Sequence, residues 1–350
     1  MAAPVTEIID ADGHIRETDE DLVTYLDPKY DRGSIRNHYF FPSLDGWQRS
    51  AVSHNALGER IERRPAGTPR PADAAGWVTF IDQTKISEAV LYPTPALSIG
   101  FTKDPGWATD LARAYNDFVY DRFLKASPRL KAVALLPVQD PAAAASELRR
   151  AVDELGMVGG LLPAVGLRRP YGDVAFDPLY AAAQALDVPL AVHGASQQGL
   201  GFDFFENFTQ GSLLSDPVAL MIQFTSMIGD RVFERFPRVK VAYLEAGCGW
   251  VPYLIERIDQ RTDRAGRHLA SEQVRDHPIY FHVELEEGAP VPVAIDAVGE
   301  DRLIYASDYP HESPEAVSHG LASFLTRDDI RDRVKQKIFC DNIKALYGFG

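Results

Sequence analysis

Carboxylate and imidazole side chains stand at several points where a short apolar segment of the chain ends. Asp12 and His14 end the first such segment, His193 ends a later one, and Asp308 and His311 follow the last. Mixed carboxylate and imidazole ligands suit Zn, Mn or Fe better than Mg or Ca, which prefer shells of oxygen alone. These residue types therefore indicate a divalent transition metal site.

The spacing of Asp12 and His14 fits one cation, because side chains two residues apart on an extended chain project to the same side. With His193 as a third ligand and the carboxylate of Asp308 as a fourth, such a site keeps a position open for water. A metal lowers the pKa of bound water to about 7 and polarises a carbonyl oxygen. The chemistry expected is attack of metal-activated water on a carbonyl carbon.

Further side chains are candidates for the same site. Glu245 ends another apolar segment and is a candidate general base or additional ligand, while Asp308 is a candidate for orienting or deprotonating the water. His282 stands on a seventh segment, two residues before Glu284, and His311 could ligate the ion or orient Asp308 through a hydrogen bond. With the extra ligands Glu245, His282 and His311 the site would hold one or two ions per chain.

Eight apolar segments alternate with helical patterns and would position these side chains. Six steps from residue 86 to residue 302 give a mean spacing of 36 residues, which suits one strand, one helix and two loops per step. The segments are apolar throughout, as expected of parallel strands buried on both faces. An α/β fold closed into a (β/α)8 TIM barrel is predicted, with a doubly wound open sheet as the alternative. The predicted strands are Thr6–Ala11, Ile86–Tyr92, Leu130–Leu136, Met157–Leu162, Val188–His193, Val239–Glu245, Ile279–Glu284 and Arg302–Ser307.

Four connecting segments open with an Asp-Pro pair, at Asp104, Asp140, Asp177 and Asp216. An Asp side chain can accept hydrogen bonds from the free N–H groups of a first helical turn, and the following Pro has no N–H to leave unpaired. Each pair therefore predicts the start of a helix.

Residues 17–76 interrupt the alternation and are rich in Pro, Gly, Arg and Asn. We expect one barrel domain over residues 1–350, in which 17–76 is an inserted, elaborated loop after the first strand that roofs the active site. Glu17, at its start, is a candidate substrate contact. Aromatic side chains that would line an apolar pocket for a sizeable organic substrate are Phe202, Phe204, Phe205, Phe208 and Trp250.

Composition narrows the range of partners. The 350 residues carry 36 basic and 50 acidic side chains, and this net charge of −14 has the wrong sign for binding nucleic acid. No apolar run is long enough to span a membrane, and the first residues do not read as a signal peptide. Two cysteines are too few for a disulfide framework. We therefore expect a cytoplasmic enzyme that acts on a small-molecule substrate.

Four motifs, in this order along the chain, resemble those of the amidohydrolase-related family within the metal-dependent amidohydrolase superfamily. They are Asp-Ala-Asp-Gly-His at 10–14 with Glu17 after it, Pro-Leu-Ala-Val-His at 189–193, the segment 236–252 that begins Phe-Pro-Arg-Val-Lys, and Tyr-Ala-Ser-Asp-Tyr-Pro-His at 305–311. The resemblance covers nearly the whole chain and implies a distorted (β/α)8 barrel. It also implies a metal held by Asp12, His14, His193 and Asp308 and, because barrels of this family often pair, a homodimer.

The family contains both hydrolases and non-oxidative decarboxylases. Its decarboxylases, such as those of γ-resorcylate, typically carry a catalytic His at the end of the sixth strand, where residues 243–247 here read Tyr-Leu-Glu-Ala-Gly. The missing His favours a metal-dependent hydrolase that cleaves an acyl bond (amide, ester, thioester or lactone), with Asp308 and Glu245 assisting the water. A metal-dependent decarboxylase of an aromatic or unsaturated carboxylic acid is the alternative, and a non-catalytic binding barrel is the second alternative.

Overall fold

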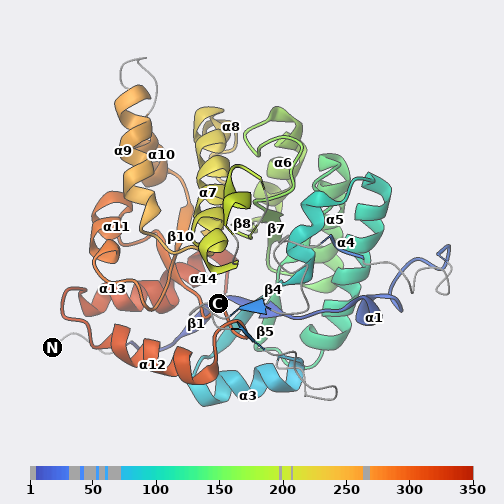
Figure 1. The fold of residues 1–350 in the computed structure, drawn as a ribbon, viewed down its shortest axis with the longest axis horizontal. Helices are drawn as coiled ribbons and strands as arrows, with labels where there is room; N and C mark the ends of the chain where they lie inside the picture. The colour runs from blue at the N-terminus through green and yellow to red at the C-terminus, as the bar shows by residue number, and fades with distance from the viewer. Residues whose placement is uncertain are drawn as a thin grey trace.

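The computed structural model describes residues 5–30, 40–42, 53–54, 60–61, 72–196, 199–205, 208–262 and 269–349 (Figure 1). Each of the predicted strands is present in this part of the chain, within a few residues of its expected place. The pairings between them are parallel, as their uniformly apolar sequences predict. The strands are β1 (Ile9–Ile15), β4 (Glu88–Pro93), β5 (Leu130–Ala132) with β6 (Ala134–Leu135), β7 (Gly160–Pro163), β8 (Leu190–His193), β9 (Val241–Leu244), β10 (Ile279–Val283) and β11 (Leu303–Tyr305).

Two sheets make up the ring of strands. One has the order β1-β4-β5 and the other has the order β11-β10-β9-β8-β7-β6. Only Val133 separates β5 from β6. The Val133 N–H donates to the Leu91 carbonyl in the first sheet, and the Ala134 N–H donates to the Gly159 carbonyl just before β7. One bent strand therefore joins the two sheets.

Hydrogen bonds between β1 and the segment after β11 close the ring on its other side. The Asp308 N–H donates to the Asp12 carbonyl (N···O 3.1 Å), and the His14 N–H donates to the Tyr309 carbonyl (2.7 Å). The fold is thus a distorted (β/α)8 barrel, because the ring closes without one continuous ladder and the register of β1 shifts once against β4. The closing bonds bring Asp12 and Asp308, two predicted metal ligands, side by side.

Helices surround the strands, as Figure 1 shows. The strands themselves are buried, and in β8 and β9 every residue is buried. Within the described ranges, none of the helices combines the length and the apolar character needed to cross a membrane. The helices of the barrel are α3 (Ala74–Thr84), α4 (Pro105–Val119), α5 (Pro141–Leu155), α6 (Asp177–Leu186), α7 (Phe208–Gly229), α8 (Val232–Arg235), α9 (Trp250–Thr262), α10 (Ala270–Asp276), α11 (Pro290–Val298), α12 (Pro314–Leu325), α13 (Asp332–Gln336) and α14 (Asn342–Tyr347).

Asp-Pro pairs begin α4, α5 and α6 as predicted, and in α4 and α5 the Asp side chain accepts hydrogen bonds from N–H groups of the first turn. The prediction is wrong at Asp216, which lies inside α7, because that helix already starts at Phe208. The carboxylate of Asp216 accepts hydrogen bonds from the Ser196 and Ser215 hydroxyls instead. An Asp-Pro pair therefore sits within a helix here because its side chain finds other donors.

Part of segment 17–76 is described, and it packs beside α4. It contains the short helix α1 (Asp19–Leu22) and an antiparallel pair of two-residue strands, β2 (Ser53–His54) and β3 (Arg60–Ile61). The rings of Tyr30 and Phe40 pack edge-on against Trp107 of α4. The rest of the expected roof lies outside the described residues, so the roof and the single-domain organisation stay predictions.

Candidate metal centre

Strand β1 brings three polar side chains to one end of the barrel. Asp10, Asp12 and His14 alternate along the strand, and all three are buried. A Cβ atom on Gly13 would stand 2.1 Å from the ring of Trp77, whose indole N–H donates to the His14 carbonyl. Only glycine therefore fits between the two predicted ligands, and the Trp77 ring fixes the backbone that carries them.

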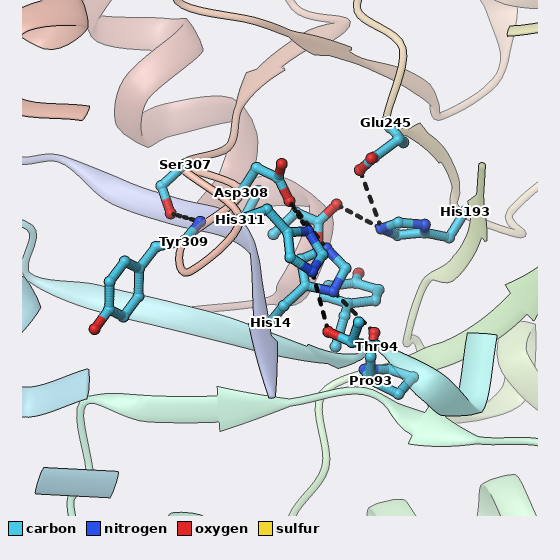
Figure 2. Close-up of polar contacts among 12 residues, drawn as sticks. His14, Pro93, Thr94, His193, Glu245, Ser307, Asp308, Tyr309 and His311 are labelled. Atoms are coloured by element: carbon cyan, nitrogen blue, oxygen red, sulfur yellow. Dashed lines mark hydrogen bonds and ion pairs between the residues drawn. The ribbon is translucent and has the colours of Figure 1, made fainter. Parts of the chain in front are cut away.

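The side chains of Asp12, His14 and His193 converge, with Glu245 beside them. Figure 2 shows His14, His193 and Glu245 of this group. His193 Nε2 lies 3.0 Å from Asp12 Oδ2 and 3.7 Å from Glu245 Oε2. His14 Nε2 lies 3.7 Å from Asp12 Oδ1. One donor atom from each of these four residues lies within 4.8 Å of the others, a spacing that could hold one ion.

Asp308 and His311 approach the same imidazole from the loop after β11. His14 Nε2 lies 3.3 Å from Asp308 Oδ1, and these two residues form with His311 a second group whose donor atoms lie within 4.8 Å of one another. His311 Nδ1 lies 2.7 Å from Asp308 Oδ1, and its Nε2 lies 3.2 Å from Thr94 Oγ1 (Figure 2). His311 thus orients Asp308, and because both groups contain His14, the four predicted ligands come together.

The hydrogen bonds of the two buried imidazoles turn their Nε2 atoms towards this point. His14 Nδ1 lies 2.8 Å from the Pro93 carbonyl oxygen, and His193 Nδ1 lies 2.6 Å from the Gly194 carbonyl oxygen. A carbonyl oxygen only accepts, so each Nδ1 carries a proton and each Nε2 of a neutral ring presents its lone pair. Neither Nε2 nor Asp12 Oδ1 has a hydrogen-bond partner among the described residues. These three buried polar atoms without a hydrogen-bond partner fit a metal ion, because an ion bound between them would interact with all three.

Electrostatics also favour a cation at this place. Burial, together with His311 and His193, holds the pKa of His14 well below its usual range. Burial acts in the same direction on His193, but the carboxylates of Asp12 and Glu245 outweigh it and raise the pKa of His193 to about 10. Burial and a neighbouring carboxylate raise the pKa of Glu245 and that of Asp308 well above their usual range. A divalent cation would neutralise the negative charge of these closely spaced carboxylates. Without the cation, bound protons reduce that charge.

A strained loop presents Glu245 to the site. Glu245, Ala246 and Gly247 directly follow β9 with φ angles of 69°, 64° and 61°. Left-handed backbone costs a residue with a Cβ about 1–2 kcal/mol, and such strain gathers at functional sites. The carboxylate of Glu287 holds the loop, because it accepts hydrogen bonds from the Cys248 N–H and from two other backbone N–H groups.

A cavity of about 150 Å³ opens beside Glu245 and Asp308. His282 of β10 lines this cavity and is only 3% exposed, and neither of its ring nitrogens has a hydrogen-bond partner in the described part of the chain. Burial lowers the pKa of His282 to about 4, so the ring is neutral. His282 belongs to neither group that could hold an ion, and its role as a ligand stays a prediction. The lining residues are Glu245, His282, Glu284, Leu285, Glu286, Ala306, Ser307, Asp308, Glu312 and Val317.

Glu17 is buried behind the site and holds the loop after β4. Its carboxylate accepts hydrogen bonds from the Thr94 N–H (3.2 Å) and the Ala96 N–H (2.7 Å). Burial raises the pKa of Glu17 to about 7. Glu17 therefore supports Thr94, the partner of His311, and its predicted contact with substrate stays a prediction.

The predicted aromatic contacts differ widely in exposure. Phe202 and Trp250 are buried, Phe205 is half-buried and Phe204 is 88% exposed, whereas the side chain of Phe208 lies outside the described part. The Trp250 ring packs against the core rings of three other aromatic residues. These four described side chains do not line the 150 Å³ cavity, and their contact with substrate stays a prediction.

Sequence reasoning overlooked two residues that position the site. Asp10 accepts hydrogen bonds from the Ser307 hydroxyl and N–H, and Thr94 contacts His311. Asp10 stands two residues before Asp12, so the alternation that identified His14 was also a signal for Asp10. Thr94 carries no comparable signal, because only the fold brings it to the loop after β11.

The fold is a parallel (β/α)8 barrel, and buried carboxylates and imidazoles lie where its strands end. This combination is typical of a (β/α)8-barrel enzyme with a metal site. A family model described as Amidohydrolase matches residues 9–349, which is nearly the whole chain. The chain belongs to this amidohydrolase family, as its motifs predicted.

Two curated relatives and one solved structure extend the comparison. The chain is 29% identical to "Decarboxylase orsB" of Emericella nidulans, over 81% of this chain and 86% of the relative. It is 27% identical to a gamma-resorcylate decarboxylase of Polaromonas sp. strain JS666, over 77% of this chain and 86% of the relative. The crystal structure of a dihydroxybenzoic acid decarboxylase from Polaromonas sp. JS666, with bound manganese and the inhibitor 2-nitroresorcinol, has a TM-score of 0.69 at 22% identity and matches 98% of this chain and 97% of that chain.

These relatives contradict the expected hydrolysis of an acyl bond, because the named activity of both is decarboxylation. The expectation was wrong because it rested on the missing His at the end of the sixth strand. Glu245 occupies that place, and burial raises its pKa well above the usual range. A group able to hold a proton is therefore present at this strand end, although it is a carboxyl group and not an imidazole.

Proposed function

We propose that this chain is a metal-dependent, non-oxidative decarboxylase of an aromatic or unsaturated carboxylic acid. The observation that carries the proposal is the likeness to decarboxylases over 81% and 77% of the chain. The convergence of Asp12, His14, His193 and Asp308 supports it, because these donors suit a divalent transition metal such as the manganese of the solved relative. Zn and Fe suit the same donors, and a second ion per chain stays a prediction.

Asp12, His14, His193 and Asp308 would hold the metal, which when bound would supply Lewis-acid stabilisation of negative charge on the substrate. The reaction breaks the bond between a substrate carbon and the carboxyl carbon. The electron pair stays on the substrate carbon, CO2 leaves, and a proton must reach the same carbon. The chain's own task is to deliver this proton and to keep the substrate carbon beside its donor.

We assign the proton donor to Glu245. Its carboxyl group lines the 150 Å³ cavity and lies 3.7 Å from His193 Nε2, so it faces both the ion site and the space for substrate. Burial, followed by the nearby Asp308 carboxylate, raises its pKa in the metal-free protein and so favours its protonated form. Asp308 also lines the cavity, and His311 fixes its orientation.

The test is release of CO2 by the metal-loaded chain from hydroxybenzoates such as 2,6-dihydroxybenzoate, beside the metal-free chain. General acid catalysis contributes about 10²- to 10⁴-fold, so Glu245→Gln should lower kcat by that factor while metal content stays the same. Glu256→Gln is the control, since Glu256 is exposed on α9 and bonds only to Gln260 among described residues. The absence of CO2 from every acid tried would refute the proposal.

The remaining expectations accompany this proposal unchanged. A small-molecule acid is the partner, and neither nucleic acid nor a membrane has a role in the reaction. A cytoplasmic location and a homodimer stay predictions.

A further inference from the structure

The cavity beside the candidate metal centre is formed by the loops that follow three neighbouring strands. Glu245 follows β9, Glu284 and Glu286 follow β10, and Asp308 follows β11, while Glu312 comes just before α12. The carboxyl ends of the strands are where barrel enzymes bind their substrates. Because Glu245 and Asp308 belong both to this lining and to the metal groups, the cavity is continuous with the site of reaction.

The lining is strongly acidic. It contains Glu245, Glu284, Glu286, Asp308 and Glu312 and has no lysine or arginine. Among the described residues, no basic side chain lies within 4.0 Å of the carboxylates of the three outer glutamates (Glu284, Glu286 and Glu312), whereas many other acidic residues in the barrel have such a partner. Negatively charged groups in one partly buried space repel each other. A positively charged group of a ligand would relieve this repulsion between the outer glutamates.

His282 is an independent sign that a ligand belongs in this cavity. It is only 3% exposed, it lines the cavity, and both of its ring nitrogens lack a hydrogen-bond partner in the described ranges. A buried imidazole normally bonds through at least one nitrogen, because leaving both unpaired costs free energy. A ligand with polar groups would satisfy it.

The size and the apolar part of the lining indicate where a ring would lie. A cavity of about 150 Å³ accepts a benzene-sized ring. Leu285, Ala306 and Val317 supply apolar contact for such a ring. Glu284 is half-buried and Glu286 and Glu312 are exposed, so the acidic groups extend outwards from the metal centre. A substituent on the far side of the ring would meet them.

We propose that the acid decarboxylated here carries a protonated amino group on a short arm remote from the departing carboxylate, and that this ammonium group binds the outer glutamates Glu284, Glu286 and Glu312. The inference rests on the proposed decarboxylase function. An ammonium group forms charge-assisted hydrogen bonds with carboxylates, whereas a second carboxylate at the same place meets only like charge. The cavity thus selects its substrate by charge as well as by shape.

The experiment uses the metal-loaded full chain and three 2-hydroxybenzoates that differ only at position 4, with an aminomethyl, a hydroxymethyl or a carboxyl group. We expect kcat/KM for the aminomethyl compound to exceed that for the hydroxymethyl compound by about 10- to 100-fold, from charge-assisted hydrogen bonds. The carboxyl compound should be the poorest substrate. Equal rates for the aminomethyl and hydroxymethyl compounds would overturn the inference and leave the decarboxylase proposal standing.

Binding separates the inference from the proposed function. The same three compounds with a nitro group in place of the carboxylate at position 1 cannot lose CO2 from that position, and calorimetry measures their affinity directly. Tighter binding of the aminomethyl nitro compound supports the charge preference even if the carboxylates release no CO2, an outcome that would refute only the decarboxylase function. Equal affinities of the aminomethyl and carboxyl nitro compounds would overturn the charge preference.

Variants locate the charge preference. Glu284→Gln and Glu312→Gln should each lower the ratio of kcat/KM for the aminomethyl compound to that for the hydroxymethyl compound by about tenfold, and Glu312→Lys should favour the carboxyl compound. Glu315→Gln is the matched control, because Glu315 is exposed in the first turn of α12 and does not line the cavity. Two metal ions per chain, of which Glu284→Gln loses one, would overturn the inference in favour of a second cation site.

Discussion

Asp10 and Ser307 are hydrogen-bonded across the point where the barrel closes, although 297 residues separate them. Asp10 Oδ2 accepts from the Ser307 hydroxyl at 2.5 Å, and its Oδ1 accepts from the Ser307 N–H at 2.8 Å. Each partner stands next to a predicted ligand, since Asp12 follows Asp10 by two residues and Asp308 follows Ser307 directly. This pair therefore sets how far apart the first-strand and last-strand ligands lie.

We predict that Asp10→Ala weakens both the fold and the metal site. The Ser307 N–H would be left buried without its partner, at a cost of about 1–3 kcal/mol. Loss of a group that orients metal ligands typically lowers metal affinity by about 10- to 100-fold. Denaturant unfolding and titration with Mn²⁺ measure the two effects. Asp328→Ala, at an exposed position, is the control. If Asp10→Ala bound metal as tightly as the parent, Asp10 would not be the residue that holds the candidate ligands in place.

Asp10 also predicts a pH dependence of stability in the metal-free chain. Burial raises the pKa of Asp10 from 3.8 to about 8, so the folded chain keeps a proton that the unfolded chain releases. Stability contributed by this proton is fully present below about pH 4 and is lost as the pH rises towards 8. Asp10→Asn, which bonds without titrating, should lose less stability than the parent between pH 5 and pH 8. Parallel stability curves for the two proteins, measured by urea unfolding, would contradict this assignment.

The two histidines of the centre should be needed for metal binding. We predict that His14→Ala and His193→Ala each lose metal on dialysis. Removing a group that only orients a ligand lowers metal affinity by about 10- to 100-fold, and removing the ligand itself should lower it further. Elemental analysis of the purified proteins gives the number of ions per chain. His319→Ala, at an exposed position on α12, should keep its metal. Full metal occupancy in the variant lacking both His14 and His193 would remove them from the site.

Metal affinity should rise with pH. His193 Nε2 must be free of its proton to bind an ion, and the nearby carboxylates raise the pKa of His193 to about 10 against the effect of burial. Metal therefore competes with a proton at every pH below that value, and affinity falls as the pH falls. Titrations with Mn²⁺ at pH 6, 7 and 8 should show this trend, and calorimetry in buffers of different ionisation enthalpy should show proton release on binding. An affinity independent of pH would mean that His193 is neutral in the metal-free chain.

The strands and the convergence of the four candidate ligands could be predicted because both depend on short stretches of sequence. A continuous apolar segment buries itself as a parallel strand wherever it lies in the ring, and a polar side chain at its end follows with it. The bond between Asp10 and Ser307 and the contact of His311 with Thr94 could not be predicted in this way, because they join elements that only the closed barrel brings together.

The reaction class was predicted wrongly for a related reason. The sequence shows that residue 245 carries a carboxyl group. It does not show that the pKa of this group is raised, because burial and the neighbouring Asp308 cause that shift. Similarly, the Asp-Pro pair at Asp216 has the residue types of a helix start, but Asp216 lies inside α7, where its carboxylate accepts hydrogen bonds from the hydroxyls of the adjacent Ser215 and of the remote Ser196. In both cases the surroundings, which local sequence does not specify, decide what the residue does.

The loop that carries Glu245 gives the last prediction. Gly247 has a φ of 61°, and a Cβ atom there would stand 2.6 Å from the carboxyl carbon of Glu287, which the Cys248 N–H and two other N–H groups hold in place. Gly247→Ala should therefore destabilise the fold by roughly 1–3 kcal/mol and lower decarboxylation by displacing Glu245. Gly288→Ala is the matched control, since a Cβ on Gly288 meets no atom of the described chain within 4 Å. Thermal unfolding and CO2 release measure both variants, and equal losses in the two would mean that the Gly247 loop is not what positions Glu245.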